Sequence, residues 1–290
     1  MRIAVCGARG MLGRQLTEAI RLRGWEALEW VRPTVDISNV STLLSAAAAD
    51  RPDIIVNCAA WTDVDGAETA PDAAFLVNHY GAKNIAACAS TYGARCIHIS
   101  TDFVYPGTTN LPLTEDALPA PQSIYGASKL QGDLALTAVS SEAVIIRTGY
   151  VFGHHGPNLI DKIASTIRAG HAMSFVDDQW ITPTSVDLLV ESILSLATSN
   201  ASGVFHVAQS GSCSVFELAS NIASLVGHSS QVSATTRAVW EPLQQARCEA
   251  VGRKLAPRPI YSVLNCEKAQ RVLDRTFPNW LSAIRTYFGL

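Results

Sequence analysis

The sequence predicts an α/β fold in which a doubly wound parallel sheet is followed by a smaller α/β domain. Through the first half of the chain, short runs rich in Ile and Val alternate with stretches of helical periodicity. This alternation is typical of parallel strands joined by crossover helices. A glycine-rich turn follows the first run, and the alternation weakens after about Val151, where Gly and Pro become frequent. We therefore expect a first domain over 1–150 and a second mainly over 151–290, with part of 178–207 returning to the first.

The elements are predicted in chain order from these two periodicities. Short apolar runs suit strands that are buried on both faces, and apolar residues at helical spacing suit helices that end at glycines such as Gly24 and Gly93. The predicted strands are 3–6, 25–31, 54–58, 96–100, 143–147 and 204–207. The predicted helices are 11–22, 40–49, 73–90, 125–138, 159–169, 185–197, 215–226, 267–273 and 280–288.

Composition excludes several classes of protein. The chain has 290 residues, of which 48% are apolar and 16% charged, so disorder and a coiled coil are excluded. A net charge of −3 leaves no basic surplus for nucleic acid or an anionic membrane. No apolar stretch approaches the roughly 18 residues of a membrane span, and the amino terminus lacks the pattern of a signal peptide. We expect a cytoplasmic enzyme.

Cysteine and histidine patterns indicate no metal site. The seven cysteines are scattered without a C-x-x-C spacing, so neither a disulfide framework nor a zinc site is expected. His154 and His155 lie in a glycine-flanked loop and have no partner at the spacing of metal ligands. His98 and His206 alternate with apolar neighbours in predicted strands, and we interpret them as core residues with satisfied hydrogen bonds.

The glycine-rich turn predicts a Rossmann-type dinucleotide site. Gly7, Gly10 and Gly13 have the spacing G-x-x-G-x-x-G directly after the first strand and open the first helix. Such glycines permit a tight turn and close approach of a pyrophosphate to the amides, at a helix end of positive potential.

The choice of nicotinamide cofactor depends on residues near the end of the second strand. Arg32, together with Arg9 from the glycine turn, suits the 2′-phosphate of NADPH, whereas Glu29 suits the ribose hydroxyls of NADH. We expect NADPH, with NADH as the alternative. Asp36-Ile37 and the segment 57–60 are placed where later loops would touch adenine, ribose and phosphates.

A hydroxyl, a phenol and an ammonium form the predicted catalytic group. Thr101 and Asp102 follow the strand 96–100, and Tyr125 and Lys129 lie four residues apart on one helix face. We expect the Lys129 ammonium to stabilise the phenolate and so lower the pKa of Tyr125 from its usual value of about 10.

These motifs resemble those of the dTDP-4-dehydrorhamnose reductases, a family of the extended short-chain dehydrogenase/reductase superfamily. The resemblance covers nearly the whole chain and rests, besides the glycine turn and YGASK, on four segments: RPDIIVNCAAWTDVDGAE (51–68), ISTDFVYPG (99–107), DDQWITPT (177–184) and RPIYSVLNCEK (258–268). The last two are similar to the family's substrate-side segments.

The resemblance implies a role for each matching residue. The cofactor site would comprise Gly7, Arg9, Gly10, Met11, Leu12, Gly13, Arg32, Asp36, Ile37, Ala60, Trp61, Thr62, Tyr125 and Lys129. Tyr125 would protonate the keto oxygen of a sugar while the nicotinamide delivers hydride to the same carbon. Thr101 would bond that oxygen, Asp102 would hold a sugar hydroxyl, and Lys129 would bond the nicotinamide ribose. No metal would be needed.

The sugar pocket departs from the family at one position. Gly149-Tyr150 stands where the family commonly has Ser-Trp, so the accepted hexose or the face of reduction can differ. Tyr150, Trp180 and Arg258 are further candidates for substrate binding. Trp180 is as consistent with a core position, and Arg258 with a surface one.

We expect NADPH-dependent reduction of a dTDP-4-keto-6-deoxyhexose, in the simplest case to dTDP-L-rhamnose, by a monomer or homodimer. The alternatives are a sister reductase that makes another deoxysugar or a streptose-type sugar, an epimerase that retains NAD, and a non-catalytic subunit similar to the partner of methionine adenosyltransferase.

Overall fold

The computed structural model describes residues 1–290 and is built on a six-stranded parallel sheet. The strand order is β10-β5-β4-β3-β1-β2, and every neighbouring pair is parallel. Its strands are β1 (Arg2–Cys6), β2 (Glu26–Trp30), β3 (Ile54–Asn57), β4 (Arg95–Thr101), β5 (Val144–Thr148) and β10 (Gly203–His206). The predicted fold class is confirmed.

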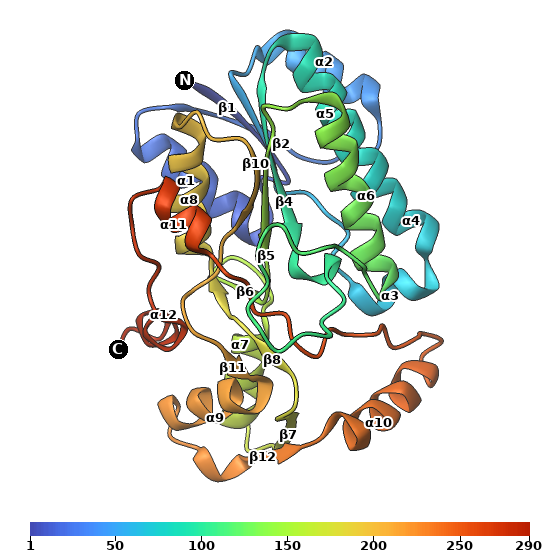
Figure 1. The fold of residues 1–290 in the computed structure, drawn as a ribbon, viewed down its shortest axis with the longest axis vertical. Coiled ribbons are helices and arrows are strands. Elements are labelled where there is room, and N and C mark those ends of the chain that lie inside the picture. The colour runs from blue at the N-terminus through green and yellow to red at the C-terminus, as the bar shows by residue number, and fades with distance from the viewer.

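Helices cover both faces of this sheet (Figure 1). The apolar residues of β1, β3 and β5 alternate between two separate cores, as expected for strands buried on both faces. One face carries α1 (Met11–Leu22), α8 (Val186–Thr198) and α11 (Glu267–Val272). The opposite face carries α2 (Val40–Asp50), α3 (Val64–Thr69), α4 (Pro71–Phe75), α5 (Gly81–Tyr92) and α6 (Ile124–Val139).

A third core lies beyond one end of the sheet. It is formed mainly by α7 (Leu159–Arg168), α9 (Val215–Leu225) and α12 (Trp280–Tyr287), with short strands between them. The strand pairs are β12 (Val232–Thr235) with β7 (Met173–Val176), β11 (Cys213–Ser214) with β8 (Trp180–Ile181), and β6 (Val151–Phe152) with β9 (Thr184–Ser185).

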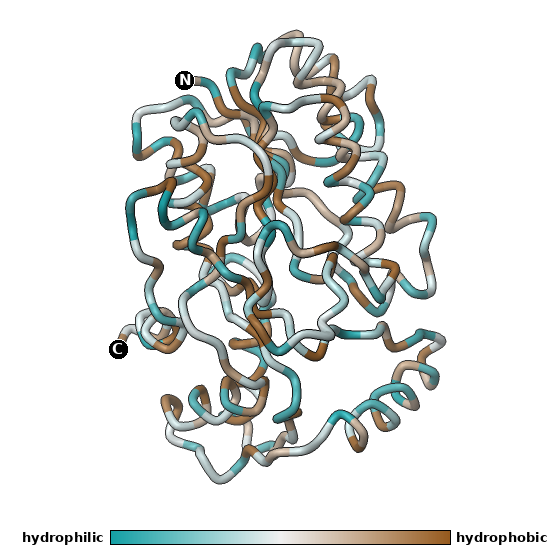
Figure 2. The backbone as a smooth tube through the Cα atoms, in the orientation of Figure 1, coloured by the Kyte–Doolittle hydropathy of each residue, from teal (hydrophilic) through white to brown (hydrophobic).

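Three helical features differ from the predictions, and one of them is the short helix α3 (Val64–Thr69), which was not predicted. The helix predicted over 73–90 is α4, then a π-helical segment η1 (Leu76–Tyr80), then α5. The helix α10 (Arg237–Glu249) was not predicted, because none of its residues is buried and it contains Pro242. Figure 2 shows that α10 is mostly hydrophilic whereas the central strands are mostly hydrophobic. No helix combines the length and the apolar character needed to cross a bilayer.

Candidate active site

The glycine turn after β1 leaves the first amides of α1 open to a ligand. Gly7 has a φ of +76°, which favours glycine, and its carbonyl accepts a hydrogen bond from the Gly10 amide at 2.9 Å. A Cβ on Gly13 would collide with that same carbonyl oxygen. Gly10 caps α1 without a side-chain hydrogen bond, and the first turn contains no acidic residue. The turn therefore fits a pyrophosphate at the helix amino terminus.

Met11 and Leu12 continue this turn into the fold. Leu12 packs against the core on the α1 face, and a Cβ on Gly156 would lie 3.0 Å from the Met11 Cβ. The loop after β6 therefore packs closely over the start of α1.

Charges near the end of β2 favour a phosphate over a ribose hydroxyl. The Glu29 carboxylate pairs with Arg21 at 2.6 Å and is turned toward α1. Arg9 and Arg32 are exposed and form no ion pair within 4.0 Å. Two unpaired guanidinium groups are suited to bind a 2′-phosphate.

Asp36 and Ile37 form a fixed loop beside α2. The Asp36 carboxylate accepts bonds from the Ser38 hydroxyl at 2.7 Å and the Ser38 amide at 2.9 Å, and these bonds lower the pKa of Asp36. The Ile37 side chain is buried and packs beneath Gly81 of α5. Its carbonyl accepts a bond from Asn84 at 3.0 Å.

The loop after β3, which contains Ala60, Trp61 and Thr62, is held by a residue that sequence reasoning missed. Asn78 accepts a bond from the Trp61 amide at 2.8 Å and donates to the Trp61 carbonyl at 3.1 Å. It also donates to the Ser128 hydroxyl at 2.9 Å. Asn78 lies in η1, and π-helical segments often occur at functional sites. Its only signal in the sequence is an amide side chain within the mostly apolar segment 73–90.

Thr101, Asp102 and Tyr125 come together at the carboxyl end of β4. The Thr101 hydroxyl donates to Asp102 at 3.1 Å, and the Tyr125 ring packs edge-on against Phe103 with centroids 5.7 Å apart. Burial raises the pKa of Asp102 to about 6, against hydrogen bonds from Ser262 and Thr101. Burial also raises the pKa of Tyr125 to about 12, against a hydrogen bond with Thr101.

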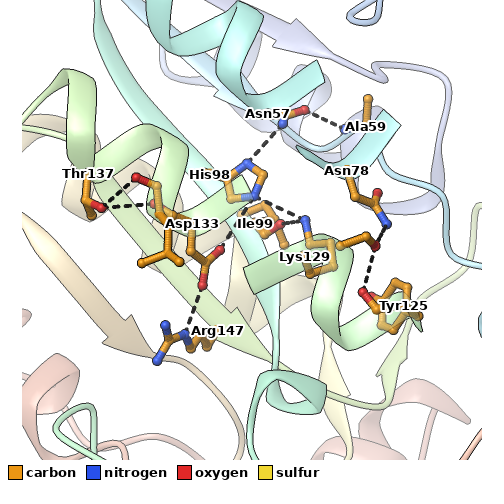
Figure 3. A network of polar contacts seen from close by, with 12 residues as sticks. Asn57, Ala59, Asn78, His98, Ile99, Tyr125, Lys129, Asp133, Thr137 and Arg147 are labelled. Atoms are coloured by element: carbon orange, nitrogen blue, oxygen red, sulfur yellow. Dashed lines mark hydrogen bonds and ion pairs between the residues drawn. The ribbon is translucent and has the colours of Figure 1, made fainter. Parts of the chain in front are cut away.

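The expectation that Lys129 lowers the pKa of Tyr125 is wrong for this structure. Lys129 is 2% exposed, and its ammonium nitrogen contacts the Ile99 carbonyl at 2.6 Å and His98 Nε2 at 3.2 Å (Figure 3). Burial lowers the pKa of Lys129 to about 8. The phenol of Tyr125 therefore stays protonated at neutral pH, as a proton donor requires.

Tyr150 lies where the sequence departs from its family. Its φ is +47°, which is uncommon for a residue with a side chain, and its hydroxyl accepts a bond from Gln179 at 2.9 Å. Asp102 and Arg258 are near enough for their charges to act on the pKa of Tyr150, which burial raises strongly. Gln179 was missed in the sequence, although it lies within DDQW.

Trp180 is exposed at the surface, whereas Arg258 is part-buried and forms an ion pair. Trp180 pairs through its backbone with the segment 260–262 and is 38% exposed, so it is not a core residue. The Arg258 guanidinium donates to Asp65 at 3.0 Å and to the Ala256 carbonyl at 2.8 Å. The carboxy-terminal segment is thereby tied across to α3. No cluster of three or more potential metal ligands is present.

This fold and site define an extended short-chain dehydrogenase/reductase: a glycine turn at the first crossover, with Thr, Tyr and Lys at the end of β4 and on α6. The family model described as RmlD substrate binding domain matches residues 1–289. The chain belongs to that family.

Relatives support the assignment. The chain is 37% identical to a dTDP-4-keto-6-deoxy-D-glucose reductase of Streptomyces niveus, over 78% of this chain and 79% of the relative. It is 32% identical to a dTDP-4-dehydrorhamnose reductase of Sinorhizobium fredii, over 98% and 96%. The crystal structure of dTDP-4-dehydrorhamnose reductase from Bacillus anthracis, in complex with NADP, matches with a TM-score of 0.90 and 32% identity, covering 99% of this chain and 98% of that one.

Proposed function

We propose that the protein is an oxidoreductase that uses NADPH to reduce the 4-keto group of a dTDP-4-keto-6-deoxyhexose. The product in the simplest case is dTDP-L-rhamnose. The observation that carries the proposal is the group of Thr101, Tyr125 and Lys129, which lies at the carboxyl edge of the parallel sheet, as the glycine turn does. The names of the relatives in the same family supply the substrate class.

The bound dinucleotide would supply the hydride, and the chain's own residues handle the oxygen. Tyr125, protonated at neutral pH, donates its proton to the keto oxygen as negative charge develops there. The Thr101 hydroxyl turns from Asp102 and donates its hydrogen to the same oxygen. Asp102 then accepts a bond from a sugar hydroxyl. Residues 1–150 mainly bind the cofactor in this proposal, and Tyr150, Trp180 and Arg258 from the remainder shape the sugar and nucleotide site.

The test is an NADPH-oxidation assay with a panel of dTDP-4-keto-6-deoxyhexoses, repeated with NADH. We expect one NADPH oxidised per sugar reduced. Conversion of a sugar without net loss of NADPH would instead identify an epimerase, and a complete lack of reaction with every sugar would favour a non-catalytic subunit.

A sister reductase with another sugar is the second candidate, and the contact between Gly149 and Asp102 favours it. A Cβ on Gly149 would lie 2.5 Å from Asp102 Oδ2 and 2.6 Å from its Cγ. The carboxyl of Asp102 thus occupies the space that the family's usual serine would fill. Product analysis by NMR separates the two candidates.

Replacing Gly149 with alanine should push the Asp102 carboxyl out of this space. Because overpacking a tight site costs about 1–3 kcal/mol, we expect kcat/KM for the sugar to fall about tenfold, through KM, with NADPH affinity unchanged. Steady-state kinetics and NADPH titration measure both. In an Asp102→Ser background the same Gly149→Ala change should cost little, and an equal loss in both backgrounds would refute the steric explanation.

Replacing Arg32 with alanine should weaken NADPH binding selectively. A charge-assisted hydrogen bond contributes about 1.5–3 kcal/mol, so we expect the Kd for NADPH to rise at least about tenfold while that for NADH stays unchanged. Fluorescence titration with both cofactors measures this. Arg23→Ala is the control, because Arg23 pairs with Glu191 on the surface. An equal loss of affinity for both cofactors in Arg32→Ala would contradict the assignment.

A further inference from the structure

A buried chain of polar side chains continues from Lys129 into the sheet (Figure 3). It consists of Asn57 on β3, His98 on β4, Lys129 and Asp133 on α6, and Arg147 on β5, each at most 5% exposed. The proposed reaction uses only Lys129. His98, interpreted from the sequence as a core residue with satisfied hydrogen bonds, is buried, and its ring contacts Lys129 at 3.2 Å.

The amide orientation of Asn57 is fixed by the loop that follows β3. The Ala59 amide donates to Asn57 Oδ1 at 3.1 Å. The other end of the side chain, Nδ2, therefore faces His98 Nδ1 at 3.0 Å. An amide nitrogen only donates, so His98 Nδ1 must accept this bond and carry no hydrogen. A neutral imidazole then carries its hydrogen on Nε2.

That hydrogen on Nε2 faces the Lys129 nitrogen. His98 Nε2 lies 3.2 Å from Lys129 Nζ and 3.8 Å from Asp133 Oδ1. Lys129 Nζ also donates to the Ile99 carbonyl at 2.6 Å. A neutral amine has both hydrogens to donate and a lone pair that accepts from His98. An ammonium has no lone pair, so the Nε2 hydrogen of His98 would face Lys129 Nζ and find no acceptor there.

We propose that His98 is a positioning residue that favours the neutral amine form of Lys129 and couples the charge of Lys129 to the cofactor loop after β3. For His98 Nε2 to accept from an ammonium, its hydrogen must move to Nδ1. The Asn57 amide would then have to turn over, and the Ala59 amide would lose its acceptor. Ala59 borders the predicted cofactor residues Ala60–Thr62.

The groups around Lys129 are consistent with this coupling. Burial favours the amine and prevails over Asp133, which favours the ammonium, so that the pKa of Lys129 falls to about 8. The pKa of His98 is held well below its usual range by burial and by Lys129, so the imidazole stays neutral. Arg147 pairs with Asp133 at 3.1 Å and reduces the influence of that carboxylate on Lys129.

The first test reads the tautomer of His98 directly, by long-range ¹H–¹⁵N NMR of the histidine rings in the full chain without cofactor, at a pH well above the pKa of about 8 that burial gives Lys129. The chain has seven histidines, and His98→Gln assigns the signal. His206 is an internal control of opposite type, because its Nδ1 faces the Leu113 carbonyl at 3.0 Å and must carry the hydrogen. We expect His98 protonated on Nε2 and His206 on Nδ1. A hydrogen on His98 Nδ1 at that pH, where Lys129 is the neutral amine, overturns the proposal.

The second test titrates Lys129 by ¹³C NMR, which is practical because the chain has only five lysines. A glutamine at position 98 can present its amide oxygen to an ammonium, so His98→Gln should raise the pKa of Lys129 by about one unit. A titration identical to that of the unaltered protein overturns the proposal. If His98→Gln does not fold, Lys129→Met assigns the lysine signal, and the His98 tautomer decides alone. Neither measurement involves turnover, so the result is independent of the proposed substrate.

Discussion

Replacing Tyr125 with phenylalanine is expected to reduce turnover by about a hundred- to ten-thousandfold while NADPH still binds. The substitution removes the phenol that the proposed reaction uses as its proton donor, and general acid catalysis contributes about 10²–10⁴-fold. The ring remains, so its edge-on contact with Phe103 is kept. Steady-state turnover and NADPH fluorescence titration provide the two measurements.

Ser128→Ala is the matched control on the same helix. Ser128 is buried and bonds Asn78 and the Tyr125 carbonyl, so its loss tests whether any change in this turn of α6 has the same effect. We expect Ser128→Ala to cost far less activity than Tyr125→Phe. Full activity in Tyr125→Phe would refute the assigned role of the phenol.

Replacing Asp133 with alanine is expected to destabilise the fold by about 3–5 kcal/mol, because it leaves the Arg147 guanidinium buried without its carboxylate. Asp133 and Arg147 are 2% and 5% exposed, and their side chains are 3.1 Å apart. Arg147 also donates to the Tyr105 hydroxyl at 2.8 Å, but a neutral phenol does not compensate its charge. Urea denaturation followed by circular dichroism measures the free energy of unfolding.

The exposed ion pair between Arg21 and Glu29 provides the comparison, since its side chains are 55% and 41% exposed. Glu29→Ala should cost less than about 1 kcal/mol. Losses of similar size in Asp133→Ala and Glu29→Ala would show that burial does not determine the importance of the Asp133–Arg147 pair.

The parts of the fold that are local in sequence could be predicted from it. The glycine turn and the Tyr125–Lys129 spacing depend on residues within a few positions of one another, and α1 has the predicted bounds. The buried strands were recognisable because both of their faces are covered. By contrast, α10 was missed because it is predominantly polar, contains Pro242 and has no buried residue.

The supporting side chains of the site could not be predicted, since they join residues far apart in the chain. Asn78 reaches Ser128 across 50 positions, and Asn57 reaches His98 across 41. The predicted direction of the shift in the Tyr125 pKa was also wrong. Helical spacing places Lys129 on the same helix face as Tyr125, but it does not show that the Lys129 nitrogen donates to the Ile99 carbonyl. Burial, which sequence reveals only indirectly, then decides the pKa.

The most direct test of the proposed reaction is transfer of deuterium to the sugar from NADPH that carries deuterium at both positions of nicotinamide C4. The deuterated cofactor is incubated with the full chain and a dTDP-4-keto-6-deoxyhexose, and the product is examined by NMR and mass spectrometry. We predict one deuterium on C4 of the sugar for each NADPH oxidised. A converted sugar that contains no deuterium, or a cofactor that remains unoxidised with every sugar of the panel, would contradict the account.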